Sequence, residues 1–249
     1  MLRKSTNKIP LHAVIVPGLF SPRWMVRPMA AYLRRHVAVV DAWDHPVVFG
    51  EMDRNVRTVG QYLEHIADRS MPTAVITHSF GDWIMRQAID RYPEHQVGHW
   101  VSIGPVVTDN RSSKWVGRLT GDSIPEIAIM RDAARAGSRT KLPSSVLHLV
   151  LWPKLDVWIR RGEYLSDPVD EIDVWATHNS ALFQYGVWRT VRDFLRCRAE
   201  ATSPPKSAQE NFRFASPEPL VGSVTCSQAG GSSLRVAGSD RGGFSNTPQ

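Results

Sequence analysis

Cysteine is scarce in this chain. Only Cys197 and Cys226 occur among 249 residues, and they are too far apart to form a CxxC pair. Two cysteines cannot build a disulfide framework or a four-ligand zinc site. We therefore expect a protein of a reducing compartment, taken as the cytoplasm, with no structural metal.

Long apolar runs and blocks of like charge are also missing. No stretch approaches the ~18 apolar residues that a membrane helix needs. The basic start followed by apolar residues is typical of a weak signal peptide, but Pro17 and Gly18 interrupt it and no small-residue cleavage site follows. The net charge of +6 comes from scattered residues, with Arg34-Arg35 and Arg160-Arg161 as the densest internal pairs. This predicts a solvated basic surface and no nucleic-acid partner.

Short β-branched runs alternate with longer helical patterns over most of the chain, and 42% of the residues are hydrophobic, enough for a core. Strands are predicted at 12–16, 37–41, 73–78, 97–103, 146–152 and 171–176. Helices are predicted from Ser21-Pro22 to about 35 with a kink at Pro28, over 54–68, from Ser79 to before Pro93, from a Ser123/Glu126 capping box to Gly137, and over 180–197. This alternation predicts an α/β protein with three layers, helix, mostly parallel twisted sheet, helix.

The composition changes beyond Cys197 to Ser, Gly, Pro and Ala with few large apolar residues. Such a segment buries too little surface to offset its ordering entropy. We expect an N-terminal extension at 1–10, one domain at 11–198, a small cap at 105–122, and a disordered C-terminal tail at 199–249.

Ser79 stands in "AVITHSFGDWIM", directly after a predicted strand and at the start of a predicted helix. Strand, sharp turn and helix are the context of a serine nucleophile elbow, in which Gly81 lets the helix pass close to the strand. The alternative is that Ser79 is only the N-cap of that helix. Thr77 is a β-branched residue that would crowd the turn.

A nucleophilic serine needs a base and a carboxylate, which parallel strands deliver at their carboxyl ends. His178 follows the strand at 171–176, whereas most other histidines lie inside strands, inside a helix or in distant connections. His78 adjoins the serine, but neighbouring side chains on a strand diverge, so it is read as a packing residue. Asp156 is the first acid after the preceding strand, although it could simply cap a short helix that begins "VWIRRGE".

Backbone N–H groups for an oxyanion are expected from two turns. The Pro-Gly turn after the first strand presents Leu19, or alternatively Phe20, and the turn after Ser79 presents Phe80. Gly18 would allow the backbone to approach a reacting carbonyl closely.

The Pro-Gly-Leu turn, the T-H-S-F-G elbow, Asp156 and His178 occur in an order that resembles the α/β-hydrolase superfamily, in particular its small bacterial serine esterases and lipases. The resemblance covers about residues 11–197 and implies a minimal α/β-hydrolase fold. It departs from the family at Thr77, at Pro17, where histidine is frequent, and in lacking a sign of the first two antiparallel strands.

The resemblance and these residues together predict a serine hydrolase that acts on carboxylic esters and uses no cofactor or metal. Ser79, His178 and Asp156 would be catalytic, and Leu19 and Phe80 would form the oxyanion hole. The substrate would be a small-molecule ester with an apolar acyl group; aromatic candidates for its pocket are Phe20, Trp24, Phe80, Trp115 and Trp158. The alternatives are a thioesterase or an amide hydrolase with the same triad, or a non-catalytic binding protein of this fold. The sequence leaves the oligomeric state open.

Overall fold

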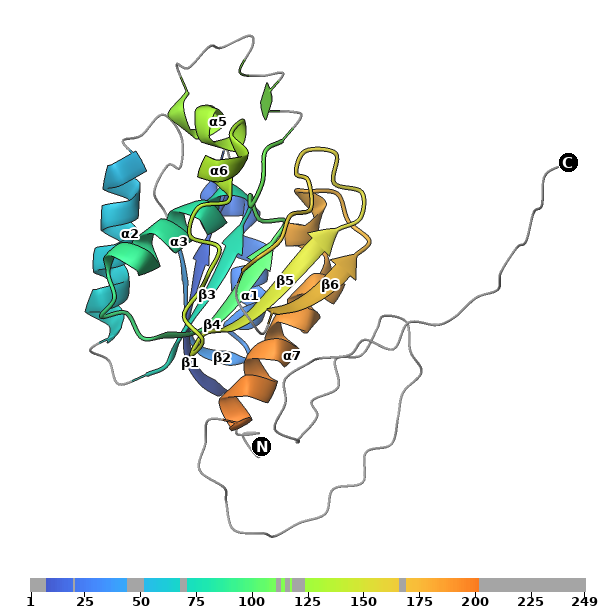
Figure 1. Cartoon of the computed structure of the whole chain (residues 1–249). Helices are drawn as coiled ribbons and strands as arrows, with labels where there is room; N and C mark the ends of the chain where they lie inside the picture. The colour runs from blue at the N-terminus through green and yellow to red at the C-terminus, as the bar shows by residue number, and fades with distance from the viewer. Residues whose placement is uncertain are drawn as a thin grey trace, which may run out of the picture.

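Six strands form the centre of the computed structural model, which describes residues 8–19, 21–43, 52–67, 71–110, 113–114, 117, 124–165 and 169–201. The strands are β1 (Ile9–Val16), β2 (Val37–Ala42), β3 (Thr73–His78), β4 (Val97–Ile103), β5 (Leu147–Pro153) and β6 (Val169–Val174). They lie in the order β2-β1-β3-β4-β5-β6, and every one of these pairings is parallel (Figure 1). The predicted parallel sheet is therefore confirmed.

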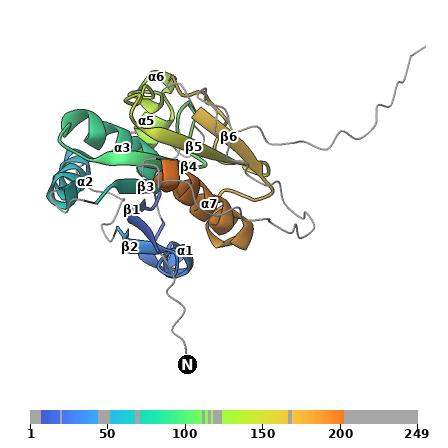
Figure 2. The same cartoon turned by 90° about the horizontal axis from the view of Figure 1, so that it is seen from below.

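Helices cover both faces of this sheet. They are α1 (Arg27–Leu33), α2 (Met52–Ala67), α3 (Phe80–Arg91), α5 (Pro125–Met130), α6 (Ala133–Ala136) and α7 (Tyr185–Ala201), with the 3₁₀ helices η1 (Arg23–Met25) and η2 (Ser180–Phe183). Figure 2 shows α2 and α3 on one face and α1 and α7 on the other. The three predicted layers are thus present. No helix in the described part of the chain has the length and apolar character to span a bilayer.

The alternation of side chains along β1 divides the core into two. Val14 and Val16 join the apolar cluster built with α2 and α3, whereas Ala13 and Ile15 join the cluster built with α1 and α7. All four are buried. A strand that is apolar on both faces must be covered on both, which is why these short runs lie inside the sheet.

Two predicted helices are each divided in the structure. The segment expected as one helix from Ser21 contains η1 and then α1, and Pro28 lies in the first turn of α1 instead of kinking a longer helix. Proline is tolerated there because the first N–H groups of a helix have no partner within it.

The segment expected as one helix up to Gly137 likewise consists of α5 and α6. Pro125 begins α5, and Asp132 ends the intervening turn by accepting hydrogen bonds from the N–H groups of Ala134 and Arg135. Gly137 does end α6, as predicted. Ser123, the expected cap, lies outside the described residues.

Some predicted segments fall outside the described part of the chain. These are residues 1–7 of the N-terminal extension, much of the expected cap at 105–122, and residues 202–249 of the expected tail. The first strand, β1, begins at Ile9, two residues before the predicted start of the domain.

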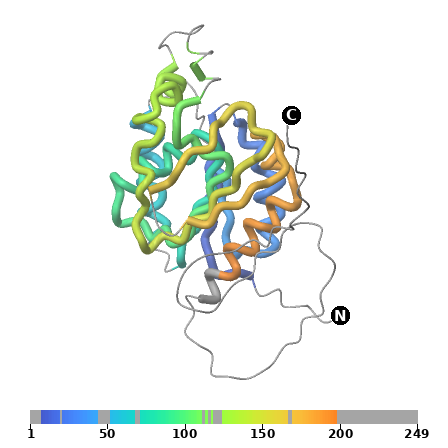
Figure 3. Tube along the Cα trace, turned by 45° about the vertical axis from the view of Figure 1, so that its right-hand side comes forward, coloured from blue at the N-terminus to red at the C-terminus, as the bar shows by residue number. Residues whose placement is uncertain are grey.

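The chain reverses its direction of winding between β1 and β3. From β1 it passes through α1 to the outer strand β2, and from β3 it passes through α3 toward β4 on the other side. The helices that follow β1 and β3 therefore leave toward opposite faces. Such a switch point opens a crevice at the carboxyl ends of the strands, where ligands of open α/β sheets bind. Figure 3 shows α5 and α6 standing beyond this same end of the sheet.

A buried ion pair ties this edge together. Asp82 accepts hydrogen bonds from Arg86 Nε at 3.0 Å, from the Ser102 hydroxyl at 2.6 Å and from the Tyr164 hydroxyl at 2.6 Å. Arg86 also donates to the carbonyl oxygens of Val106 at 2.6 Å and of Ala136 at 3.0 Å. The pair thus joins α3 to the loop after β4 and to the end of α6.

Removing one partner of this pair should destabilise the fold strongly. Arg86→Met would leave the Asp82 carboxylate buried without its cation, which costs about 3–5 kcal/mol of unfolding free energy. Urea unfolding measures this. Arg91→Met is the matched control, since its pair with Asp53 is solvent-exposed and such pairs contribute at most about 1 kcal/mol. Equal small losses in both variants would show that the buried pair does not hold the fold together.

Candidate active site

Ser79 has an unusual backbone conformation. Its φ is 53° and its ψ is −126°, and among the described residues only Ser79 and Arg139 combine a side chain with positive φ. Its N–H donates to the Ile103 carbonyl at 3.0 Å, and its own carbonyl accepts from the Asp82 N–H at 3.1 Å. A conformation of this kind costs about 1–3 kcal/mol and persists only where surrounding structure enforces it.

The hydroxyl of Ser79 does not cap the helix. Ser79 occupies the N-cap position of α3, but its side chain makes no capping hydrogen bond. The capping alternative raised by the sequence would need the hydroxyl to accept from an N–H of the first turn. The strained turn therefore presents this hydroxyl without using it for the helix.

Two glycines make the turn possible. A Cβ on Gly81 would lie 2.3 Å from the carbonyl oxygen of Pro17, so only glycine lets α3 start against the end of β1. The sequence predicted that the helix passes close to the strand before Ser79, which is β3. In the structure the helix passes close to the end of the neighbouring strand, β1. A Cβ on Gly18 would lie 2.6 Å from Ser79 Cβ, so the Pro-Gly turn and the serine are in direct contact.

Thr77 does not crowd the turn in the way its shape suggested. Its buried hydroxyl donates to Asp82 Oδ1 at 3.0 Å and accepts from the indole N–H of Trp100 at 3.0 Å. The side chain therefore points into the buried network below α3, away from the turn.

Asp156 and His178 lie in direct contact. His178 Nδ1 donates to Asp156 Oδ2 at 2.6 Å, and their side chains are only 10% and 6% exposed. Because Nδ1 carries the proton, Nε2 of the neutral ring keeps its lone pair. The acid after β5 and the histidine after β6, expected to meet from their positions alone, do meet.

The second carboxylate oxygen of Asp156 accepts hydrogen bonds from the backbone. Oδ1 accepts from the N–H groups of Trp158 and Ile159, each at 2.9 Å. This is the capping function that the sequence offered as an alternative, although a bend and no helix follows. Burial by itself raises the pKa of Asp156, but the hydrogen bond and charge of His178 and then two backbone N–H groups outweigh it, so the pKa lies below its usual value. Asp156 is therefore an anion that orients His178.

Gly104 places this pair beside the serine. It follows Ile103, whose carbonyl binds the Ser79 N–H, and it has a φ of +53°. A Cβ on Gly104 would lie 3.2 Å from His178 Nδ1 and 3.5 Å from Asp156 Oδ2. The pair and Ser79 thus lie against the same two residues at the end of β4. No hydrogen bond among the described residues joins the Ser79 hydroxyl to His178, a contact that in unliganded sites often forms only with substrate.

His78 has a role that sequence reasoning missed. It was read as a packing residue, and its ring is indeed buried, 4.7 Å from the ring of His178. Its Nε2 is also 3.2 Å from the backbone carbonyl of His178, so Nε2 carries the proton and donates. A Cβ on Gly18 would lie 3.0 Å from His78 Nδ1. His78 therefore contacts both the histidine segment and the Pro-Gly turn, a position that only the folded chain reveals.

The two expected N–H donors lie on either side of Ser79. Phe80 is the first residue of α3, where N–H groups have no partner within the helix, and its side chain is buried. Leu19 follows Gly18, which touches Ser79. Phe20, the alternative donor, lies outside the described residues.

A second serine also has a histidine and an aspartate close by. Ser102 Oγ is 2.9 Å from His148 Nε2 and donates to Asp82 Oδ1 at 2.6 Å. Here both neighbours bind the hydroxyl itself, and the aspartate does not orient the histidine as a relay requires. Ser102 is fully buried and His148 is 2% exposed. This group is therefore part of the buried network around Arg86.

No group of three or more His, Cys, Asp or Glu residues in the described ranges has an arrangement that could hold a metal ion.

Comparison with known proteins places this geometry in a fold. No family model matches the sequence, and no curated protein matches it either. Solved structures do match. Aspergillus fumigatus lipase B superposes with a TM-score of 0.60 at 16% identity, over 78% of this chain and 53% of the lipase.

Two further matches span nearly the whole of the other protein. The metagenome-derived lipolytic enzymes LipS and LipT give a TM-score of 0.58 at 12% identity, over 75% of this chain and 94% of theirs. A soluble variant of the monoglyceride lipase of Saccharomyces cerevisiae gives a TM-score of 0.56 at 9% identity, over 82% of this chain and 90% of the lipase. The chain has the α/β-hydrolase fold.

The chain spans only part of the length of some matched structures. Three of the matched structures are much longer, and the chain spans 37%, 53% and 39% of their lengths. The first two antiparallel strands, for which the sequence has no signal, are absent from the described sheet, in which every pairing is parallel. Identities of 9–16% show a shared fold and leave the chemistry to be argued from the residues.

Two of the buried histidines, His78 and His148, should make stability depend on pH. Burial, followed by the charge of His178, lowers the pKa of His78 to about 3, and burial lowers the pKa of His148 to about 4. The unfolded chain protonates each near pH 6.5, so below that pH it binds protons that the folded chain does not. The unfolding free energy should therefore fall as pH falls, by about 2 kcal/mol per histidine between pH 6.5 and pH 5.

Urea unfolding across this pH range measures the effect. His148→Gln should remove about half of the histidine contribution, whereas His65→Gln, at an exposed position, should leave the slope unchanged. A slope in the His148 variant equal to that of the wild type would mean that burial does not lower the pKa of this ring.

Proposed function

We propose that this chain is a serine hydrolase that cleaves carboxylic esters. The observation that carries the proposal is the Asp156–His178 hydrogen bond at 2.6 Å, beside a serine in a strained turn whose hydroxyl does not cap its helix. In an acyl-transfer site the base is a neutral histidine that a buried carboxylate orients. The shared fold with lipases and esterases supports the same chemistry by analogy.

In this mechanism His178 Nε2 takes the proton of Ser79 as Oγ attacks the carbonyl carbon of the ester. The resulting oxyanion accepts hydrogen bonds from the N–H groups of Phe80 and Leu19. His178 then gives its proton to the leaving oxygen, which releases the alcohol and leaves an acyl ester on Ser79. Water, deprotonated by His178, attacks this ester, and His178 returns the proton to Ser79 Oγ as the acid is released. No step uses a metal or a cofactor.

Asp156 and His78 have supporting roles in this scheme. Asp156 keeps the proton on His178 Nδ1 and stabilises the imidazolium that forms during attack. His78 holds the backbone carbonyl of His178, and its lowered pKa keeps it neutral, so it places no second positive charge beside the base.

Alanine variants of Ser79 and Ser102 test which serine is the nucleophile. Ser79→Ala should abolish labelling by a fluorophosphonate probe and lower kcat on p-nitrophenyl acetate by at least about a thousandfold, while Ser102→Ala should keep the label. Asp156→Asn should retain labelling at a reduced rate, because the ring loses its tautomer and orientation. Labelling that persists in the Ser79 variant and disappears in the Ser102 variant would reverse the assignment. No labelling of folded wild-type protein would favour a non-catalytic binding protein.

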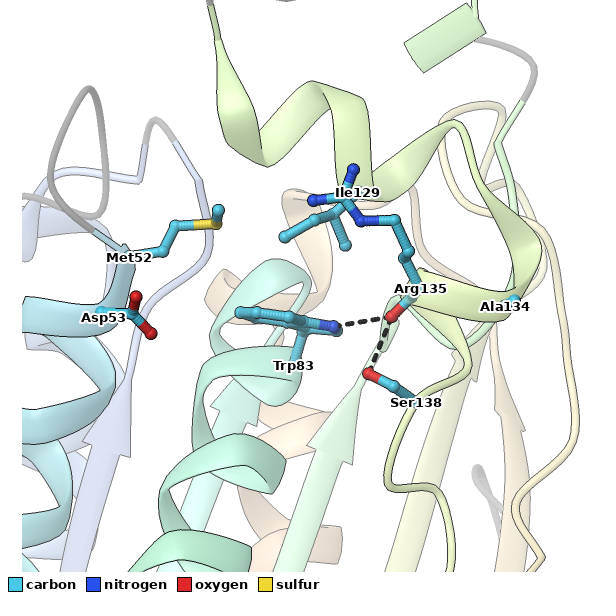
Figure 4. A pocket seen from close by; sticks show the side chains of 7 residues that line it. All are labelled: Met52, Asp53, Trp83, Ile129, Ala134, Arg135 and Ser138. Carbon is cyan, nitrogen blue, oxygen red and sulfur yellow. Dashed lines mark hydrogen bonds between the residues drawn. The ribbon is translucent and has the colours of Figure 1, made fainter.

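A pocket lined in part by side chains of α3 and α6 is our candidate site for an apolar acyl group. It has a volume of about 620 Å³ and is lined by Met52, Asp53, Trp83, Ile129, Ala134, Arg135 and Ser138 (Figure 4). Trp83 lies one helical turn from Ser79, and its ring stacks on that of Phe80 at 5.3 Å. Four of the seven lining residues are apolar and three are polar or charged, and the volume of the pocket lies within the range of small-molecule sites.

These lining residues differ from those expected from the sequence. Of the five aromatic candidates, Phe20 and Trp115 lie outside the described residues, and Trp24 and Trp158 are exposed. Phe80 is buried beneath the pocket, where it supports Trp83. Thioesters and amides would bind the same way, so the pocket alone does not choose among these alternatives.

Narrowing the pocket should change the preference for acyl chain length. Met52→Trp should lower kcat/KM for p-nitrophenyl octanoate by about tenfold, because the loss of a few methylene contacts costs about 1–3 kcal/mol. The acetate ester, which does not reach the pocket, should be hydrolysed at the wild-type rate. Met52→Leu, of similar volume, is the control and should keep the wild-type profile. A parallel loss on both esters would mean that the acyl chain binds elsewhere.

A further inference from the structure

Large apolar side chains are exposed around the mouth of the proposed site. The described residues expose eight of them, and six follow the carboxyl ends of β1, β5 and β6: Trp24, Leu155, Val157, Trp158, Trp175 and Phe183. Trp24, Trp158 and Trp175 are 58%, 55% and 72% exposed. We call these six side chains the apolar rim.

The apolar rim flanks the Asp156–His178 pair on two sides. On one side, Leu155, Val157 and Trp158 surround Asp156 in sequence, and the Leu155 N–H donates to the Ala176 carbonyl at 3.0 Å, next to Trp175. On the other side, the rings of Trp24 and Phe183 lie 6.1 Å apart and join η1 to η2. The rim therefore lies beside the Asp156–His178 pair, which would act on the substrate.

Three cations beside the rim form ion pairs. Lys154 lies 3.9 Å from Asp173 and 5.3 Å from the centre of the Trp175 ring. Arg161 binds Asp173 at 2.9 Å, and Arg160 lies 3.6 Å from Asp109. These three cations beside the rim therefore each lie within ion-pair distance of a carboxylate.

We propose that the apolar rim docks on the surface of zwitterionic or uncharged lipid, and that the ester substrate is drawn from that surface. This inference rests on the proposed function. Its four aromatic rings leave on the order of 400 Å² in contact with water, if each ring has about 200 Å² to bury. An exposed apolar area of this size is comparable with the largest apolar patch of a typical monomer, which is often a functional surface. Tryptophan favours the boundary between lipid and water, since its ring is apolar and its N–H is polar.

The position of the rim favours lipid over a protein partner. A protein seated on these side chains would cover the entrance to Ser79, whereas a lipid surface would bring acyl chains to it. The paired charges lead to a specific expectation. Docking driven by burial of apolar surface should not weaken with salt, whereas adsorption through the net positive charge would.

The test uses the full chain with Ser79→Ala, so that binding is measured without turnover. Co-sedimentation with phosphatidylcholine vesicles should show binding that is the same at low and high salt. Adding Trp24→Ser, Trp158→Ser and Trp175→Ser should weaken it by at least about tenfold. The control adds Leu165→Ser and Tyr185→Ser, which remove exposed side chains outside the rim, and should bind as before.

Three results would overturn the docking proposal: no sedimentation with vesicles, binding that high salt removes, or equal losses in the rim variant and the control. Urea unfolding shows whether each variant is folded. Fluorophosphonate labelling of wild-type protein without vesicles tests the proposed hydrolase alone. A labelled enzyme that does not bind vesicles would therefore refute the docking proposal and leave the hydrolase intact.

Discussion

The parallel direction of all six strands is the constraint on which the rest of this structure depends. Because every strand ends at the same edge, residues that follow different strands are brought together although a hundred positions separate them in sequence. Ser79 follows β3, Asp156 follows β5 and His178 follows β6. The reversal of winding between β1 and β3 then opens the edge at the serine, which is why the Pro-Gly turn after β1 can touch it.

Close backbone contact and a buried charge pair convert this edge into a rigid site. Gly18 and Gly81 allow β1, β3 and α3 to meet without side chains between them. Below them, Arg86 binds Asp82 and the carbonyl oxygens at the end of α6. Such a buried pair adds little to stability compared with an apolar core, but it requires one arrangement of its hydrogen-bonding partners. Its value here is that it keeps α6, which lines the pocket, at a set position relative to the serine.

Much of the fold could be predicted because local patterns carry it. The β-branched runs indicated six strands, and their order placed Asp156 and His178 at a common edge. The divided helices could not be predicted from periodicity, since Pro28 and Asp132 act through the exact turn in which they lie. The contact of His78 with the His178 carbonyl and the pocket at Met52 and Trp83 join distant segments. No local pattern records contacts of this kind.

The backbone at Ser79 has an evolutionary consequence. A positive φ is more easily adopted by glycine than by any residue with a side chain. Replacement of this serine by glycine would relieve the strain, so random drift toward greater stability would tend to remove the hydroxyl. A chain that keeps serine at such a position gives up stability for reactivity, which is what selection for use, as opposed to selection for folding, would leave behind.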